Sequence, residues 1–343
     1  MVTAYDVATR AGVSVGTVSR YLTGNGYVGT VTQQRIARAI EELGYVRNRA
    51  AASLTTKSTG LLGFVVSDLR NPFVAEIASA LSQNARATGY GLVVAESGND
   101  PDASLQSLEL LRAHGVDGVI VTPPESPGLN SALVAAARSI PVVGIGLRTD
   151  PLVSDTVTSN TESGAHDAVT HLLGLGHSEV AYLGLDKQTA GRLRGFRSAM
   201  AEGGPQVKAR EIFVDQLTQA DGVAALSMLI EADDVPRAIF AANDAVALGV
   251  LQAANRAGLR VPTDLSVVGF DDIAMAAHSA PPLTPVAQPT ADMGAAAISM
   301  VLSRLHGEER DVPPREAVLA ARLIVRESSA VAATANGKEQ PKQ

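Results

Sequence analysis

The sequence contains no cysteine among its 343 residues. It therefore forms neither a disulfide framework nor a thiolate metal site. The amino-terminal segment lacks the apolar region of a secretory signal. No stretch of the chain is apolar over the length needed to cross a bilayer. These absences predict a cytoplasmic protein that does not enter the membrane.

Motifs of the common enzyme classes are also missing. The sequence has no P-loop, no G-x-G-x-x-G and no histidine pair spaced for a metal ion. Residues 12–16 match the G-x-S-x-G pattern of hydrolases, but that pattern follows a strand, and here it lies between two predicted helices. We interpret His166, His171 and His177 as surface or packing residues. The sequence thus favours a protein that is not an enzyme, with no cofactor and no metal.

The charges are distributed unevenly along the chain. Residues 1–60 hold seven Lys and Arg against three Asp and Glu, whereas the remainder holds 21 against 32. A small basic segment on a large acidic body suggests that this segment meets a polyanion. The length of the chain suits two or three domains.

The amino-terminal segment reads as three short helices. They are expected over residues 6–11, 15–22 and 32–43, with a turn at Gly12 and an N-cap at Ser14. If the apolar residues pack inward, the second helix turns an outer face toward solvent, as a helix-turn-helix does in a major groove. That face consists of Val15, Gly16, Thr17 and Arg20.

This outer face predicts contacts with double-stranded DNA. Arg20 can donate two hydrogen bonds to guanine O6 and N7. Tyr5, Ser14 and Thr17 suit phosphate contacts, which position a protein without specifying a sequence. The alternative from spacing alone is an ordinary three-helix domain with a surface arginine.

Strands and helices alternate from residue 61 onward. Strands are expected at 61–66, 91–95, 118–122, 141–145, 179–184, 210–214, 237–241, 265–270 and near 318–325, with helices between them, one of them at 130–138. Such alternation implies parallel sheets with helices on both faces, here arranged as two lobes with a cleft between them. Residues 47–60 are a connector of low hydrophobicity, and the polar residues 331–343 are expected to be a disordered tail.

The ordered motifs along the chain resemble the lactose-repressor/galactose-repressor (LacI/GalR) family. The resemblance is carried by residues 4–22 (AYDVATRAGVSVGTVSRYL), 41–45 (EELGY), 71–73 (NPF), 115–120 (GVDGVI), 192–196 (RLRGF), 242–244 (AND), 261–272 (VPTDLSVVGFDD), 282–284 (PLT), 288–289 (QP) and 323–328 (LIVRES). It implies a sequence-specific transcriptional regulator, most often a repressor. Such a regulator is a homodimer that binds an inverted-repeat operator and has a periplasmic-binding-protein-like body controlled by a small carbohydrate.

The resemblance also divides the chain and adds DNA contacts. It implies a helix-turn-helix domain at 1–46, a hinge at 47–60, an N-terminal lobe from 61–158 and 290–318, and a C-terminal lobe from 159–289 and 319–330. Asn25, Asn48 and Leu54 join the DNA-binding set, with Leu54 as an apolar wedge in the minor groove. The hinge departs from the family, which usually has Pro at position 47 and Arg at position 52; here these are Arg47 and Ala52.

The resemblance implies six effector-binding residues, taken from the positions of this sequence that match the family. They are Asp68, Phe73, Arg192, Asn243, Asp271 and Gln288. Carboxylates, amides and an arginine around an aromatic side chain suit a polyhydroxylated ligand. A helix-capping role stays open for Asn243 and Asp271.

Several departures from the family in the cleft suggest an effector unlike the better-known ones. Gly146-Leu147 stands where Asp-Arg is common, Ser159-Asn160 where Asp-Asn is common, and Leu217 where an aromatic residue is often seen. Gly16 is likewise smaller than the usual residue of the recognition helix. A transport binding protein and an intracellular sugar-processing enzyme are the competing functions. The helix-turn-helix and the missing signal argue against the first, and the missing catalytic group argues against the second.

Overall fold

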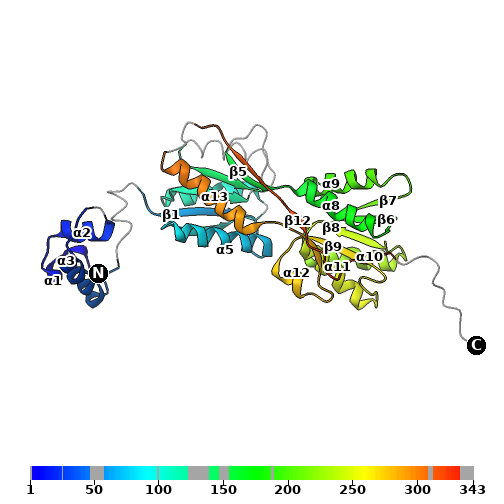
Figure 1. The fold of residues 1–343 in the computed structure, drawn as a ribbon, viewed down its shortest axis with the longest axis horizontal. Coiled ribbons are helices and arrows are strands. Elements are labelled where there is room, and N and C mark those ends of the chain that lie inside the picture. The colour runs from blue at the N-terminus through cyan, green and yellow to red at the C-terminus, as the bar shows by residue number, and fades with distance from the viewer. Residues whose placement is uncertain are drawn as a thin grey trace, which may run out of the picture. The chain divides into compact units, whose positions relative to one another are not determined.

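The computed structural model describes residues 2–24, 26–46, 58–98, 100–122, 139–146, 154–186, 189–307 and 312–332. The chain divides into two compact units, Met1–Gly60 and Leu61–Gln343 (Figure 1). We call the first unit the head and the second the body. The described part of the head is helical, whereas the body contains two sheets and their covering helices.

The head consists of helices α1 (Ala4–Ala11), α2 (Val15–Thr23) and α3 (Thr30–Leu43). Thr3 and Asp6 form a reciprocal capping box at the start of α1. Gly12 ends α1 with a φ of 63°, a conformation that glycine adopts without a steric penalty. α1 and α3 begin earlier than the sequence predicted. A small apolar core joins the three helices, formed by Val7, Ala8, Ala11, Val18, Val28, Ile36 and Ala39.

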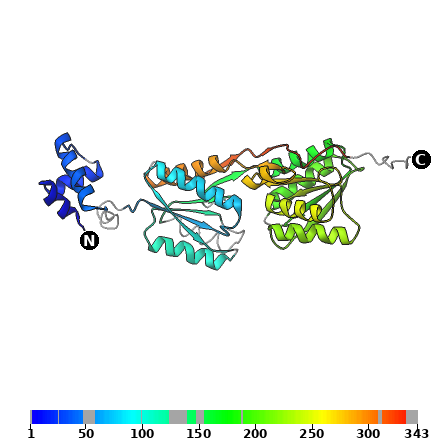
Figure 2. The same ribbon diagram turned by 90° about the horizontal axis from the view of Figure 1, so that it is seen from below.

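The first sheet of the body has six parallel strands in the order β11-β5-β4-β3-β1-β2. They are β1 (Leu61–Val66), β2 (Gly91–Glu96), β3 (Gly118–Thr122), β4 (Val142–Ile145), β5 (Asp155–Ser159) and β11 (Glu316–Leu319). Helices α5 (Pro72–Ala87) and α13 (Thr290–Leu305) cover one face, and α6 (Pro101–Ala113) covers the other (Figure 2). β1, β3 and β4 are apolar runs because both faces of the sheet are covered.

The second sheet has the order β12-β10-β9-β8-β6-β7, and only the β10–β12 pair is antiparallel. Its strands are β6 (Glu179–Gly184), β7 (Lys208–Phe213), β8 (Ala238–Ala241), β9 (Ser266–Asp271), β10 (Thr284–Ala287) and β12 (Arg322–Leu323). α8 (Thr161–Gly174) and α9 (Ala190–Glu202) pack on one face, and α10 (Gln219–Glu231) and α11 (Asp244–Arg256) pack on the other. The short helix α12 (Ala274–His278) follows β9.

The chain passes between the two sheets three times, from β5 to α8, from β10 to α13 and from β11 to β12. These passages differ from the sequence prediction in three places, one of which is β10 (Thr284–Ala287), a strand that the sequence did not predict. The single strand expected near 318–325 is two strands, β11 and β12, in different sheets. β5 was not predicted, because its sequence DTVTS has no apolar run, yet all five of its residues are buried. The helix predicted at 130–138 lies outside the described residues.

Candidate DNA-binding surface and ligand cleft

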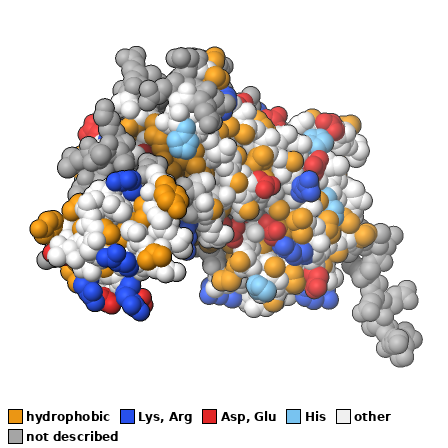
Figure 3. Space-filling view, turned by 60° about the vertical axis from the view of Figure 1, so that its left-hand side comes forward, with side chains coloured by type: hydrophobic (Ala, Val, Ile, Leu, Met, Phe, Trp, Pro, Cys, Tyr) orange, Lys and Arg blue, Asp and Glu red, His pale blue; other side chains and the backbone are white. Residues whose placement is uncertain are grey.

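Helix α2 presents most of the predicted base-reading residues to solvent. Val18 faces the core, while Val15 is 42% exposed and Gly16 and Arg20 are also exposed. The Arg20 Nε donates to the Gly16 carbonyl oxygen at 3.3 Å. Figure 3 shows Lys and Arg side chains on the visible face of the head. This surface is free to meet the edges of bases.

The predicted phosphate-binding residues lie at the amino-terminal ends of α1 and α2. Ser14 Oγ accepts a hydrogen bond from the Thr17 amide at 3.1 Å, and the two hydroxyls lie 2.9 Å apart. Tyr5 is 70% exposed, whereas Thr17 is half-buried. A helix amino terminus is a favourable place for a phosphate. The predicted contacts Asn25, Asn48 and Leu54 lie outside the described residues.

Three of the predicted effector residues form one buried network in the body. Arg192 Nη2 donates to Asp271 Oδ1 at 3.2 Å, and Gln288 Nε2 donates to the same oxygen at 2.6 Å. The Arg192 guanidinium also donates to the Ala242 carbonyl at 2.6 Å and lies 4.2 Å from the centre of the Phe270 ring. The Gln288 Oε1 accepts from Ser159 Oγ at the end of β5, which links this network to the first sheet.

The turn that carries Asp271 has an uncommon backbone. Asp271 has a φ of 116° and Asp272 a φ of 62°, a region that residues other than glycine rarely adopt. The turn is held from both sides. Asp244 Oδ2 accepts from the Ile273 amide at 2.9 Å, and Arg326 Nη2 donates to Asp272 Oδ1 at 2.7 Å. These contacts fix the direction of the Asp271 carboxylate.

The remaining predicted effector residues are separated from this network. Asn243 caps α11, because its Oδ1 accepts from the Val246 amide at 2.9 Å, and its Nδ2 donates to the Leu217 carbonyl at 3.1 Å. The capping role left open by the sequence is therefore present for Asn243. Phe73 packs against the apolar clusters of both lobes. Nearby, Glu76 accepts from the Ala274 amide at 3.2 Å, a contact between lobes that the sequence did not predict.

Asp68 lines a cavity of about 670 Å³ between loops of the two lobes. Its carboxylate receives two hydrogen bonds of 3.0 Å from the Arg70 guanidinium, which lowers the pKa of Asp68. The sequence did not assign the other polar residues of this cavity to the ligand; Asn71 belongs to a family motif, while the others follow strand ends without a distinctive motif. The cavity is also lined by Ser67, Asn71, Asp186, Asp215, Gln216 and Thr218, with Leu185, Leu217, Leu248, Ile273 and Met275 as its apolar part.

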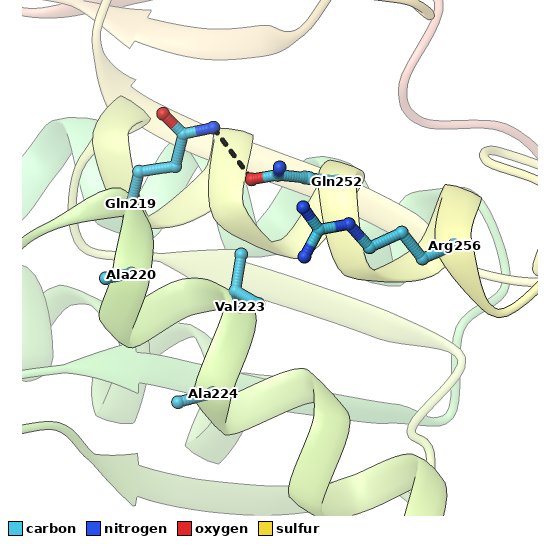
Figure 4. Close-up of a pocket in the computed structure, with 6 residues that line it drawn as sticks. All are labelled: Gln219, Ala220, Val223, Ala224, Gln252 and Arg256. Carbon is cyan, nitrogen blue, oxygen red and sulfur yellow. Dashed lines mark hydrogen bonds between the residues drawn. The ribbon is translucent and has the colours of Figure 1, made fainter.

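A second groove lies between α10 and α11 and contains none of the predicted residues (Figure 4). Its volume is about 530 Å³, and a hydrogen bond of 3.1 Å from Gln219 Nε2 to Gln252 Oε1 crosses it. The close-up shows the Arg256 side chain on the α11 side of the same groove (Figure 4). The groove is lined by small, amide and arginine side chains. None of them is a nucleophile or a general base, so this groove shows no catalytic chemistry.

The three histidines considered in the sequence, His166, His171 and His177, are hydrogen-bonded to neighbouring groups. His177 Nε2 lies 3.0 Å from Ser266 Oγ, His171 Nε2 lies 3.0 Å from Ser329 Oγ, and His166 Nε2 lies 3.0 Å from Glu202. Among the described residues, no group of three or more His, Cys, Asp or Glu is arranged to hold a metal ion. No helix in the described ranges has the length and apolarity of a membrane span.

Burial dominates the electrostatics of the Asp271 network. It raises the pKa of Asp271 to about 6, against the opposing effect of Arg192. Burial, and then the charge of Asp271, raise the pKa of Asp244 well above its usual range. Both carboxyls therefore favour their protonated form more than an exposed aspartate does.

This shift makes the stability of the body depend on pH. Between about pH 4 and 6 the folded chain holds a proton on Asp271 that the unfolded chain has released, so the contribution of Asp271 falls as the pH rises. The difference from the ordinary value of 3.8 corresponds to roughly 3 kcal/mol of destabilisation at neutral pH.

Replacing Asp271 by asparagine should remove this dependence. Urea denaturation at pH 5 and pH 7.5 measures the free energy of unfolding of both proteins. We expect the parent to lose about 1–3 kcal/mol relative to the variant between these two pH values. An identical pH dependence of parent and variant would show that Asp271 does not titrate in this range.

Comparison with known proteins agrees with this architecture. Residues 3–48 match the model described as bacterial regulatory proteins, lacI family, and residues 169–329 match the periplasmic binding protein-like domain. The transcriptional regulator DegA of Bacillus subtilis (strain 168) is 37% identical over 298 residues, which cover 85% of this chain and 88% of DegA.

Solved structures agree as well. The lac repressor dimer bound to operator and the anti-inducer ONPF superposes with a TM-score of 0.85 at 30% identity, covering 96% of this chain and 99% of the repressor chain. The regulator CelR in complex with cellobiose gives a TM-score of 0.69 at 31% identity, covering 96% and 100%.

A helix-turn-helix head joined to a two-lobed body with a ligand cleft defines a ligand-responsive DNA-binding protein. The chain belongs to the LacI family of bacterial regulatory proteins. The predicted fold class and the resemblance noted in the sequence are both confirmed. DegA is a transcriptional regulator, and PurR of Mannheimia succiniciproducens, 32% identical and covering 96% of this chain and 98% of PurR, is a transcriptional repressor.

Proposed function

We propose that this protein is a transcriptional repressor whose affinity for operator DNA is controlled by a small carbohydrate bound between the two lobes. One observation carries the proposal: a capped, exposed helix α2 and a buried Arg192–Asp271–Gln288 network occur in one chain of this family. The first suits a major groove, and the second offers charged and amide groups to hydroxyls.

The DNA-binding half of the proposal assigns roles to the head. Arg20 reads a guanine, Val15 and Gly16 face neighbouring bases, and Tyr5, Ser14 and Thr17 hold phosphates. Asn25, Asn48 and Leu54 complete the set, with Leu54 as the minor-groove wedge. The protein acts as a cytoplasmic homodimer, so the operator is an inverted repeat.

The ligand-binding half assigns the effector to the cleft. We assign Arg192, Asp271 and Gln288 to the hydroxyls of the ligand, although none of them lines the cavity that Asp68 lines. Phe73 and Asn243 contact the ligand or support the residues that do. CelR is in complex with cellobiose, and a LacI-family regulator from Enterococcus faecium contains ribose; these similar proteins favour a neutral sugar here.

The domain boundaries follow from the same proposal. Residues 1–46 bind DNA and residues 47–60 form the hinge. Residues 61–158 and 290–318 form the N-terminal lobe, residues 159–289 and 319–330 the C-terminal lobe, and residues 331–343 the tail. The head gives no support to a transport binding protein. The cleft gives none to a sugar-processing enzyme.

The experiment is selection from a pool of random DNA duplexes with the full-length chain. We expect an enriched inverted repeat, and the affinity for it should fall steeply with salt because several phosphates are contacted. Full-strength binding to an isolated half-site would contradict the dimer, and a pool without enrichment would contradict sequence-specific binding.

Replacing Arg20 by alanine should lower affinity for the selected operator by about 1–3 kcal/mol and relax the preference at one base pair of each half-site. The reason is the loss of two hydrogen bonds to a guanine edge. Repeating the selection with the variant measures this change. If the enriched sequence stays the same at every position, Arg20 does not read a base.

A further inference from the structure

The Arg20 side chain lies between two glycines of the head. Its Nε donates to the carbonyl oxygen of Gly16, one turn earlier on α2, at 3.3 Å. A Cβ atom added to Gly26 would lie 3.2 Å from Arg20 Cδ and 3.6 Å from Cγ. The aliphatic part of Arg20 therefore lies so close to the Gly26 backbone that a side chain at position 26 would crowd it.

This placement leaves the end of the arginine available. Within the described residues, the two terminal nitrogens of Arg20 have no hydrogen bond or ion pair, while Nε is bound to Gly16. Two terminal N–H groups match the O6 and N7 acceptors of guanine. Because a long arginine loses rotamer freedom when it binds, a pose fixed beforehand favours binding.

The loop that carries Gly26 is itself anchored to the head. Val28 is buried in the core, and its carbonyl accepts from Gln33 Nε2 of α3 at 2.9 Å. Gly26 has a φ of 107°, a conformation that only glycine adopts readily. Val28 therefore ties the segment that follows Gly26 to the core of the head, close to the contact with Arg20.

We propose that Gly26 is a positioning residue for base recognition: it sets the pose of Arg20 and thereby the strength of its preference for one base pair. The inference rests on the proposed function, since it assumes that Arg20 reads a base. A side chain at position 26 moves Arg20 Cδ by a few tenths of an ångström, and the guanidinium beyond it moves with it.

The test compares Gly26→Ala and Gly26→Asn with Gly24→Ala and Gly24→Asn. Gly24 also has a positive φ, 69°, but a Cβ there would meet no atom within 4 Å, so it controls for a substitution in the same loop that does not contact Arg20. Its backbone strain is smaller, because the φ of 107° at Gly26 lies outside the left-handed helical region. Among residues other than glycine, asparagine is one of those that adopt positive φ most often, so the asparagine variants give a second measurement if an alanine variant does not fold. Non-specific binding of each full-length variant to random DNA at low salt checks that the head is folded.

Selection from the random duplex pool gives the readout. We expect the Gly26 variants to lose preference, about fivefold or more, at the same base pair that Arg20→Ala affects. The Gly24 variants should keep it. Adding Gly26→Ala to Arg20→Ala should cause no further loss at that pair, because the positioned group is already gone.

Two results would overturn the proposal in different ways. If the Gly26 variants weaken binding equally at all positions and keep the Arg20-dependent preference, then Gly26 has only a structural role, and the proposed function stands. If Arg20→Ala itself leaves the selected sequence unchanged, base reading by Arg20 fails, and the inference about Gly26 fails with it.

Discussion

Replacing Arg192 by alanine is expected to leave operator binding unchanged and to abolish the response at the sugar concentrations that act on the parent protein. Arg192 contacts Asp271, the Ala242 carbonyl and the Phe270 ring, all within the body. The DNA-binding helices belong to the separate head. Loss of a charged hydrogen-bonding partner typically costs about 1.5–3 kcal/mol, which corresponds to a roughly 10- to 150-fold weaker sugar affinity.

Arg194→Ala is the matched control for this variant. Arg194 lies on the same helix, α9, but it is 58% exposed and pairs with the exposed Glu162. We expect it to respond to the sugar like the parent. The measurement is the operator dissociation constant of each protein across a sugar titration. An Arg192→Ala protein that responds at the parental sugar concentration would remove Arg192 from the ligand site.

Replacing Asp155 by alanine is expected to destabilise the body by about 3–5 kcal/mol. Asp155 is 1% exposed and receives Arg304 Nη2 at 2.7 Å and Arg315 Nη2 at 2.8 Å. Burial alone would raise the pKa of Asp155, but hydrogen bonds from these two arginines outweigh burial and hold its pKa below the usual value. Without the carboxylate, two partly buried guanidinium groups would face each other.

Asp264→Ala provides the comparison on the surface. Asp264 pairs with Arg260, whose side chain is 72% exposed, and exposed pairs contribute about 0–1 kcal/mol. Urea denaturation of both variants at neutral pH measures the contrast. A loss of stability in Asp155→Ala no larger than that in Asp264→Ala would mean that the buried ion cluster does not hold β5 in the sheet.

The same cluster shows why part of the fold was not predictable from the sequence. Apolar strands such as β1 and β9 are visible in the sequence as apolar runs, and the sequence predicted them. β5 begins with an aspartate whose partners, Arg304 and Arg315, are 149 and 160 residues away. No local pattern contains that pairing, so a buried strand that begins with a charged residue gave no signal of a strand.

The ligand cleft shows a similar division. The family motifs contained Arg192, Asp271 and Gln288, and the structure brings their side chains together. The motifs did not indicate the positive φ of Asp271 or the contact of Gln288 with Ser159, because both depend on how distant segments of the chain pack together. Asn243 matched a motif as well, but its side chain caps α11.

The most direct test of sugar-controlled DNA binding is the coupling between the two ligands. The operator dissociation constant is measured with and without each member of a panel of neutral pentoses, hexoses and disaccharides. For the sugar that acts, its own affinity is then measured with and without operator. We expect both constants to change by the same factor, about 5- to 150-fold, because coupling between two sites is reciprocal. Tight operator binding that no sugar changes, together with sugar binding that operator leaves unaltered, would contradict the account.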